Sequence, residues 1–180
     1  MQPAPTLVTR VRDAEQGNLA AVQDVLRAAN AGFAGIVPPS FYRAYLRNLL
    51  ILSNRMDGSQ LLLAECEGRV VGTITFYPDA SREGWNWPSA WTGLRACAVL
   101  PALRGQGIGR SLTQACIDRS RVLGAPAICL HTGSFMHAAI ALYERLGFKR
   151  CPTFDHQAAA MFASDFNEPP IAVLAYRLDL

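Results

Sequence analysis

The stretch Arg104-Gly105-Gln106-Gly107-Ile108-Gly109 lies shortly after the apolar segment Leu94–Val99 and opens an amphipathic segment. Its three glycines stand at alternate positions, and without side chains they let neighbouring backbone N–H groups point into one concave surface. A helix after them adds first-turn N–H groups without partners and the positive end of its dipole. The spacing therefore predicts a strand–loop–helix unit that binds an anion such as a pyrophosphate.

Two common phosphate-binding loops do not fit this stretch. A Walker loop needs a Lys after its last glycine, and the only Lys of the chain is Lys149. A dinucleotide fingerprint needs its third glycine where Arg110 stands, and no Asp or Glu about 20 residues further on closes a second parallel strand. A glycine-rich turn that binds no ligand is the simple structural alternative.

The pattern Arg-x-x-Gly-x-Gly, entered from a strand ending in Ala98-Val99 with Pro101 just beyond, resembles the acetyl-CoA-binding loop of the GNAT family of N-acetyltransferases. A second motif, Ala141–Phe148 (ALYERLGF), resembles the last motif helix of that family, with its Tyr and Gly-Phe in place. Two motifs in the family's order are more specific than one glycine loop. The resemblance covers roughly residues 60–150. It implies an α/β fold with a mixed, mostly antiparallel sheet flanked by helices, whose central strands splay apart to admit the pantetheine arm.

Length and composition indicate a single globular domain. The chain has 180 residues, of which 51% are hydrophobic and 17% charged, and we expect one acetyltransferase domain over 6–180 after a loose tail at 1–5. The net charge of +3 comes from scattered residues, mostly Arg, without a basic run, which argues against nucleic acid as a partner. The preference for Arg over Lys is typical of a GC-rich bacterial genome.

Targeting and redox features predict a cytoplasmic protein. No apolar run reaches the roughly 18 residues of a membrane span, and the first residues lack the basic and apolar regions of a signal peptide. The five cysteines show no C-x-x-C spacing, so we interpret them as small core residues in a reducing compartment and expect no metal.

Periodicity predicts alternating strands and helices. We expect Ser40 to cap the second helix, Glu67-Gly68 to form a hairpin turn and Gly124 to end the third helix. The expected strands cover residues 6–12, 60–66, 69–77, 91–99, 127–131, 148–152 and 172–180, and the expected helices cover 19–29, 40–50, 108–123 and 136–146.

The resemblance assigns roles in acyl transfer from acetyl-CoA. Backbone N–H groups of the glycine loop would bind the pyrophosphate, with added charge from arginines, and N–H groups at the end of the central strand, Val99 first among them, would polarise the thioester carbonyl. The cofactor-binding residues implied are Cys97, Ala98, Val99, Arg104, Gly105, Gln106, Gly107, Ile108, Gly109 and Arg110.

Tyr143 is the residue that the resemblance implies as the catalytic acid. A phenol with a pKa of about 10 can protonate a leaving thiolate whose pKa is about 8.5 across a hydrogen bond. The alternative is a Tyr packed in the core, because it shares helical spacing with Ala139, Leu142 and Leu146.

Two positions depart from the family's pattern. Many relatives carry a Glu on the central strand where this chain has Gly93, so the base is unassigned among Asp79, Glu83, His131 and His156. A water relay, or an amine that is already partly neutral, would also serve. Many relatives also carry an Asn, which donates to the cofactor arm, where this chain has Met136, and Met cannot donate that bond.

The acceptor should be the amine of a small molecule or peptide. We expect its site among the first two helices and the loops 78–89 and 152–170, with an apolar pocket of Phe33, Phe41, Tyr42 and Tyr45. Trp85, Trp87 and Trp91 are better explained by packing under a loop than by a ligand clamp. Without an acidic cluster, an amino acid derivative with an apolar part fits better than a polyamine.

Two other functions and the oligomeric state stay open. A non-catalytic module that senses acyl-CoA would share the cofactor site, and so would an acyltransferase for alcohols or longer acyl chains. Dimerisation through the late strands is common in folds of this kind.

Overall fold

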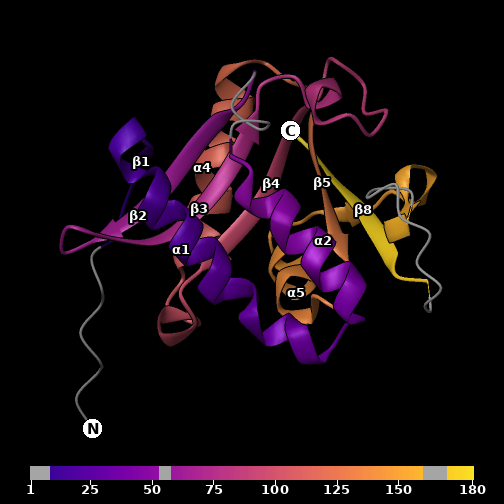
Figure 1. The fold of residues 1–180 in the computed structure, drawn as a ribbon. Coiled ribbons are helices and arrows are strands. Elements are labelled where there is room, and N and C mark those ends of the chain that lie inside the picture. The colour runs from indigo at the N-terminus through magenta and orange to yellow at the C-terminus, as the bar shows by residue number, and fades with distance from the viewer. Residues whose placement is uncertain (1–8, 53–57, 160–169) are drawn as a thin grey trace, which may run out of the picture.

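The computed structural model describes residues 9–52, 58–159 and 170–180, so the expected tail 1–5 and the start of the first expected strand lie outside the described residues. The chain forms an 8-stranded sheet in the order β1-β2-β3-β4-β5-β8-β6, with β7 paired to β8 (Figure 1). The strands are β1 (Arg10–Asp13), β2 (Gln60–Cys66), β3 (Arg69–Tyr77), β4 (Thr92–Val99), β5 (Ala127–Gly133), β6 (Lys149–Arg150), β7 (His156–Gln157) and β8 (Ala172–Asp179).

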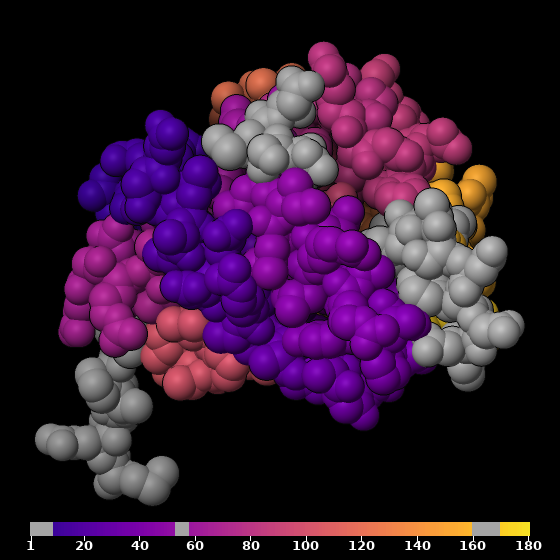
Figure 2. Space-filling view, viewed as in Figure 1, coloured from indigo at the N-terminus to yellow at the C-terminus, as the bar shows by residue number. Residues whose placement is uncertain are grey.

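Every strand pairing is antiparallel except that of β4 with β5, which confirms the expected mixed, mostly antiparallel α/β fold. The longer helices are α1 (Leu19–Asn30), α2 (Pro39–Leu50), α4 (Ile108–Val122) and α5 (His137–Arg145). In Figure 1, α1 and α2 lie in front of the sheet and α4 behind it. Figure 2 shows the α1–α2 pair covering much of this face, bordered above by the connection from β3 to β4.

The helices bury the apolar stripes that their sequences predict. On one face, α1 packs Val22, Val25 and Leu26 against Ala98 of β4. On the other face, α4 and α5 share a core cluster with the sheet, and the α4 residues in it are Ile108, Leu112, Cys116 and Ile117. Helical spacing of about 3.6 residues places these side chains on one side of each helix, so the sheet lies between two apolar layers.

The hairpin between β2 and β3 has the expected turn. Glu67 and Gly68 have φ values of 49° and 76°, as a two-residue turn with two left-handed residues requires. The turn fixes the register of β3, which places Gly72 opposite Val99 at the end of β4.

The central strand β4 carries a bulge that the sequence pattern does not predict. Thr73 faces Ala98 and Thr75 faces Arg95, so one residue of β3 lies opposite both Ala96 and Cys97. Ala96 has a φ of 55°, in the left-handed region that side chains other than glycine rarely adopt. A bulge bends its strand and interrupts the ladder, and here it does so at the middle of the molecule.

Beyond this bulge, β4 and β5 separate. Their parallel pairing joins Thr92–Leu94 to Ile128–Leu130 and extends no further along either strand. From Arg95 onward the two strands diverge, as the expected splay requires. Beyond Leu94, one edge of β4 has no partner among the strands of the described residues.

Some expected element ends need correction. Helix α2 begins at Pro39 with Pro38 as its N-cap, so Ser40 lies inside the first turn and is not the cap. A proline at the first helical position loses no intrahelical hydrogen bond and already has a helical φ, which explains the earlier start. The expected strand 148–152 is limited to β6, and β7 was not expected at all. Among the helices of the described residues, none is long and apolar enough to cross a membrane.

Candidate active site

A cavity of about 830 Å³ lies where β4 and β5 diverge. Its lining comes from the end of α1, from α2, from the diverging halves of β4 and β5, from the N-terminal part of α4, and from α5 along its length. Tyr143 and all of the expected cofactor-binding residues except Gln106 contribute to it. Segments that lie between Ala29 and Val173 in the sequence thus form one concave site, the usual location of a ligand.

The glycine loop forms one end of the cavity. Gly105 and Gly107 have φ values of 78° and 82°, and a Cβ added to either would meet no heavy atom within 4 Å. The space above both residues is therefore open to a ligand. Gly107 is the N-cap of α4, whose first-turn N–H groups have no intrahelical acceptor. Positive side chains from Arg110 and Arg145 also line the cavity, which suits an anion.

The side chain of Arg104 makes a hydrogen bond within the protein that its place in the motif does not predict. Its Nη2 donates a hydrogen bond of 2.6 Å to the carbonyl oxygen of Ala29, at the end of α1. A guanidinium at a helix C-terminus satisfies a carbonyl and interacts favourably with the helix dipole. The side chain therefore ties the loop to α1, while the residue still lines the cavity.

The free edge of β4 presents backbone donors to the cavity. The N–H of Leu100 donates to the carbonyl oxygen of Val71 on β3 at 2.9 Å. Because successive N–H groups of a strand alternate in direction, the N–H of Val99 points to the other edge, where β5 has diverged. Cys97, Ala98 and Val99 all line the cavity.

Tyr143 of α5 is buried and lines the same cavity. It is 5% exposed, and its ring lies 5.8 Å from the ring of Phe148. Burial raises the pKa of its phenol well above 10, and the nearby Cys97 adds to the rise. Both effects keep the hydroxyl protonated, as an acid must be before it donates. Tyr143 thus lies both in the core and in the wall of the cavity. Packing in the core and a role as an acid therefore do not exclude each other.

Cys97 is a poor nucleophile in this environment. Burial raises the pKa of its thiol to about 11, although a hydrogen bond with Thr113 acts in the opposite direction. The thiolate is the reactive form of cysteine, and little of it exists near neutral pH at this pKa. A thiol in this environment is a poor candidate for carrying an acyl group as a covalent intermediate.

Glu83 is the only carboxylate among the described residues that line the cavity. Its side chain is 2% exposed, accepts a hydrogen bond of 3.2 Å from Nε1 of Trp87, and lies 4.0 Å from Nε of Arg95. Burial raises the pKa of Glu83 to about 7, against the lowering effects of Arg95 and Trp87. A carboxylate with such a pKa can accept a proton near neutral pH.

Gly93 of β4 lies directly against the turn that carries Glu83. Glu83 lies in the short helical turn Ala80–Glu83, which packs against β4. A Cβ at Gly93 would lie 3.4 Å from the Cβ of Ala80. This distance is an ordinary van der Waals contact, and the carboxylate that reaches the cavity comes from the turn itself, at Glu83.

His131 lies on β5 and lines the cavity near Glu83. Its Nε2–H donates to the carbonyl oxygen of Phe154 at 2.8 Å, and its buried Nδ1 has no hydrogen-bond partner among the described residues. Burial lowers the pKa of His131 to about 4. The ring is therefore neutral at pH 7, and the lone pair on its buried Nδ1 has no donor among the described residues.

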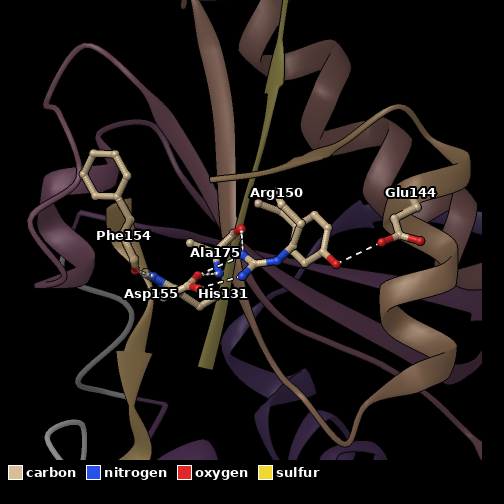
Figure 3. Close-up of polar contacts among 7 residues, drawn as sticks. His131, Glu144, Arg150, Phe154, Asp155 and Ala175 are labelled. Carbon is tan, nitrogen blue, oxygen red and sulfur yellow. Dashed lines mark hydrogen bonds and ion pairs between the residues drawn. The ribbon is translucent and has the colours of Figure 1, made fainter. Parts of the chain in front are cut away.

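A polar network fixes the segment that holds His131 (Figure 3). Asp155 receives two hydrogen bonds from Arg150, of 2.8 and 2.6 Å, and a third from the backbone N–H of Ala175 on β8. Arg150 also donates to the carbonyl oxygen of Ala175 at 2.6 Å. These bonds join the segment to β8, and Phe154 presents its carbonyl oxygen to His131 from there.

Some of the other expected site residues line the cavity, and some do not. Phe33, Phe41, Tyr45 and Met136 line the cavity, whereas Tyr42, Asp79 and His156 do not. The three tryptophans pack with Phe154 and Cys129 in a cluster under the β3–β4 connection, as expected. Sequence reasoning missed the roles of Ala96, Arg95 and Arg145, since nothing in an isolated Ala or Arg marks it as part of a site.

Comparison with known proteins identifies the family. The model of the acetyltransferase (GNAT) family matches residues 22–148. The protein named "Uncharacterized N-acetyltransferase YjgM" of Escherichia coli (strain K12) is 31% identical over 131 residues, which are 72% of this chain and 75% of that protein. The chain therefore belongs to the GNAT acetyltransferase family.

Two further similar proteins show how much of a relative's length the chain covers and which ligand a protein of this fold binds. The protein named "Probable N-acetyltransferase camello" of Xenopus tropicalis is 37% identical over 100 residues, and these cover 53% of this chain but 43% of that protein, so the chain spans less than half of it. The yncA structure from Salmonella typhimurium, solved with its cofactor acetyl-CoA, has the same fold with a TM-score of 0.64 and 22% identity, over 96% of this chain and 94% of that one.

Proposed function

We propose that the protein is an N-acetyltransferase that moves the acetyl group of acetyl-CoA directly to a primary amine of a small molecule or peptide. The observation that carries the proposal is the free edge of β4, which opens onto one cavity with the glycine loop at one end and Glu83 at the other. The family and the solved relative that binds acetyl-CoA support the same donor.

Donor binding would use the residues at the loop end. The N–H groups from Arg104 to Gly109 would bind the pyrophosphate, with Arg110 and Arg145 adding positive charge. The N–H of Val99, with Cys97 and Ala98 beside it, would bind the thioester carbonyl as negative charge develops on its oxygen. The bulge at Ala96 supports this role because it holds the backbone donors in place before the reaction.

Proton transfer would use Glu83 and Tyr143. Glu83 would remove a proton from the ammonium of the acceptor, and the free amine would attack the thioester carbon. As the C–S bond breaks, the hydroxyl of Tyr143 would protonate the thiolate of CoA. The position of Glu83 in the cavity favours it over Asp79 and His156, and its pKa favours it over His131.

Calorimetric titration and an amine screen test the proposal together. We expect micromolar binding of acetyl-CoA, no binding of ATP, and release of CoA with at least one amine. Near pH 7, Tyr143→Phe and Glu83→Gln should each lower kcat by about 100-fold, the usual contribution of an acid or base. Tyr42→Phe and Glu67→Gln are matched controls outside the cavity and should retain activity.

Three results would contradict the proposal in different ways. Without CoA binding, the glycine loop is a structural turn. Binding without turnover on any amine supports the acyl-CoA sensor instead. Turnover only with alcohols or with longer acyl-CoA donors identifies another acyltransferase on this fold. The cytoplasm is the location that we propose, on the pattern of the cysteines.

A further inference from the structure

The acceptor end of the cavity holds one positive and one negative side chain close together. Arg95 and Glu83 both line it, with 4.0 Å between Nε and Oε1. Among the described residues, the guanidinium makes one hydrogen bond, of 2.6 Å from Nη2 to the side-chain oxygen of Asn48, and that single ion pair. A guanidinium has five N–H donors, so several remain for a ligand.

The charge of the cavity favours an acceptor that carries a negative group. Glu83 is its one carboxylate within the described residues, whereas its basic side chains include Arg95 at this end and Arg104, Arg110 and Arg145 near the glycine loop. A polyamine would bring several positive charges to this surface, where Glu83 is the one carboxylate of the described residues that could pair with them. An anionic group beside the amine would instead find Arg95, whose planar donors suit a carboxylate.

An aromatic wall lies on the same side of the cavity. Phe33 and Phe135 meet edge to face with ring centroids 5.0 Å apart, and Phe41 meets Phe135 in the same way at 5.9 Å. Tyr45 stacks on Phe41 at 5.7 Å and donates its hydroxyl proton to Asn30. The hydroxyl is thus satisfied within the protein, and the wall offers apolar ring surface to a ligand.

We propose that the acceptor is a free α-amino acid with a large apolar side chain. Its carboxylate would bind Arg95, its amine would lie toward Glu83, and its side chain would pack on the aromatic wall. One carbon separates the amine and carboxylate of such a molecule, which matches a cation and an anion 4.0 Å apart in the site. This inference rests on the proposed N-acetyltransferase function and names its substrate class.

The test compares free amino acids with their carboxamides, which keep the amine and the side chain but lose the carboxylate. L-Phenylalanine, L-leucine and glycine are each assayed as the free acid and as the amide. We expect a higher kcat/KM for both apolar acids than for their amides, and a value for glycine at least about tenfold lower than for leucine.

The Arg95→Gln variant distinguishes carboxylate binding from a general effect on Glu83. Loss of the guanidinium also raises the pKa of Glu83, but that change acts on both substrates alike. We therefore expect kcat/KM for L-phenylalanine to fall by about 100-fold and that for its amide by less than about threefold. Arg47→Gln, on the exposed side of α2, is the matched loss of charge and should change neither.

The outcomes separate this inference from the proposed function. Equal use of acid and amide, or an equal fall for both in Arg95→Gln, overturns the amino acid proposal and leaves the N-acetyltransferase intact. If no amine is acetylated, titration of L-phenylalanine and its amide into the CoA-bound protein shows whether Arg95 forms a carboxylate-binding site. Binding of the acid that is lost in Arg95→Gln supports the carboxylate site, and its absence overturns it.

Discussion

Glu83, the proposed base, is a residue whose burial costs stability. Burial raises its pKa from 4.5 to about 7, so the folded protein binds this proton more tightly than the unfolded chain does. Stability at this residue is therefore greatest at low pH and falls as the pH rises from about 4.5 to about 7. A residue selected only for folding would not place a carboxylate at 2% exposure beside tryptophan rings.

Glu83→Gln should therefore stabilise the protein in alkaline solution. Gln can still accept the hydrogen bond from Trp87 but carries no charge to bury. At about pH 8 we expect the free energy of unfolding to rise by up to about 3 kcal/mol, since each pKa unit corresponds to about 1.4 kcal/mol. Near pH 4.5 the gain should vanish. Urea unfolding at both pH values measures it, with the exposed Glu67→Gln as control, and a gain that is equal at both pH values would contradict this account.

Trp87 acts on the same carboxylate through its indole N–H. This hydrogen bond stabilises the charged form of Glu83 and lowers its pKa. Trp87→Phe keeps an aromatic ring in the cluster but loses the donor. We expect the acidic limb of the kcat/KM profile to move upward by about one pH unit, with little change on the alkaline plateau.

The control for this positioning role is Trp91→Phe. Trp91 packs in the same aromatic cluster, with its ring 5.9 Å from that of Trp87, and makes no hydrogen bond to Glu83. A merely structural effect would lower the alkaline plateau of kcat/KM in both variants. It would leave the pH of the acidic limb unchanged. That result would remove Trp87 from the proposed mechanism.

At the scale of elements, the bulge of β4 depends on its neighbour β3. A Cβ at Gly72 would lie 3.1 Å from the carbonyl oxygen of Ala98 and equally close to side-chain atoms of Ile108 and Leu112. The side chains can yield slightly, but the carbonyl belongs to the strand that carries the bulge. Gly72 therefore lets β3, β4 and α4 approach one another where the free edge begins.

Gly72→Ala should destabilise the fold. Overpacking of this kind costs about 1–3 kcal/mol, which lowers the melting temperature by roughly 2–4 °C for each kcal/mol in a chain of this size. Gly32→Ala is the control, because a Cβ there would meet nothing within 4 Å. Thermal unfolding of both variants checks the prediction, and equal melting temperatures would show that the strands can move apart without cost.

The elements also show which parts of the fold could be predicted from sequence. Strands β2 and β3 and helix α4 follow from period-2 and period-3.6 patterns and from glycine signals at their ends, which are local properties. The left-handed Ala96 could not be predicted, because an isolated Ala avoids that conformation and only the tertiary structure imposes it. Likewise, Gly93 indicated a missing Glu, but only the tertiary structure shows that Glu83, from a turn packed against β4, lines the cavity.

At the scale of the whole molecule, the sheet consists of two halves with a narrow seam. Strands β1 to β4 lie on one side and β5, β8 and β6 on the other, and the pairing across the seam is limited to Thr92–Leu94 with Ile128–Leu130. The cavity occupies the rest of the seam. A ligand that touches both walls would replace contacts that a continuous ladder would otherwise supply, so binding should stabilise the fold as a whole.

Acetyl-CoA should therefore raise the melting temperature markedly. At a concentration 100-fold above its Kd, a ligand specific to the folded state adds about 2.7 kcal/mol, which corresponds to roughly 5–10 °C here. ATP should give no such shift. Gly107→Ala, which forces a side chain into a left-handed conformation at the N-cap of α4, should reduce the shift at equal ligand concentration. Hydrogen exchange locates the effect: slower exchange in both β4 and β5 supports binding across the seam, whereas slowing confined to the loop and α4 would mean that the ligand contacts one half alone.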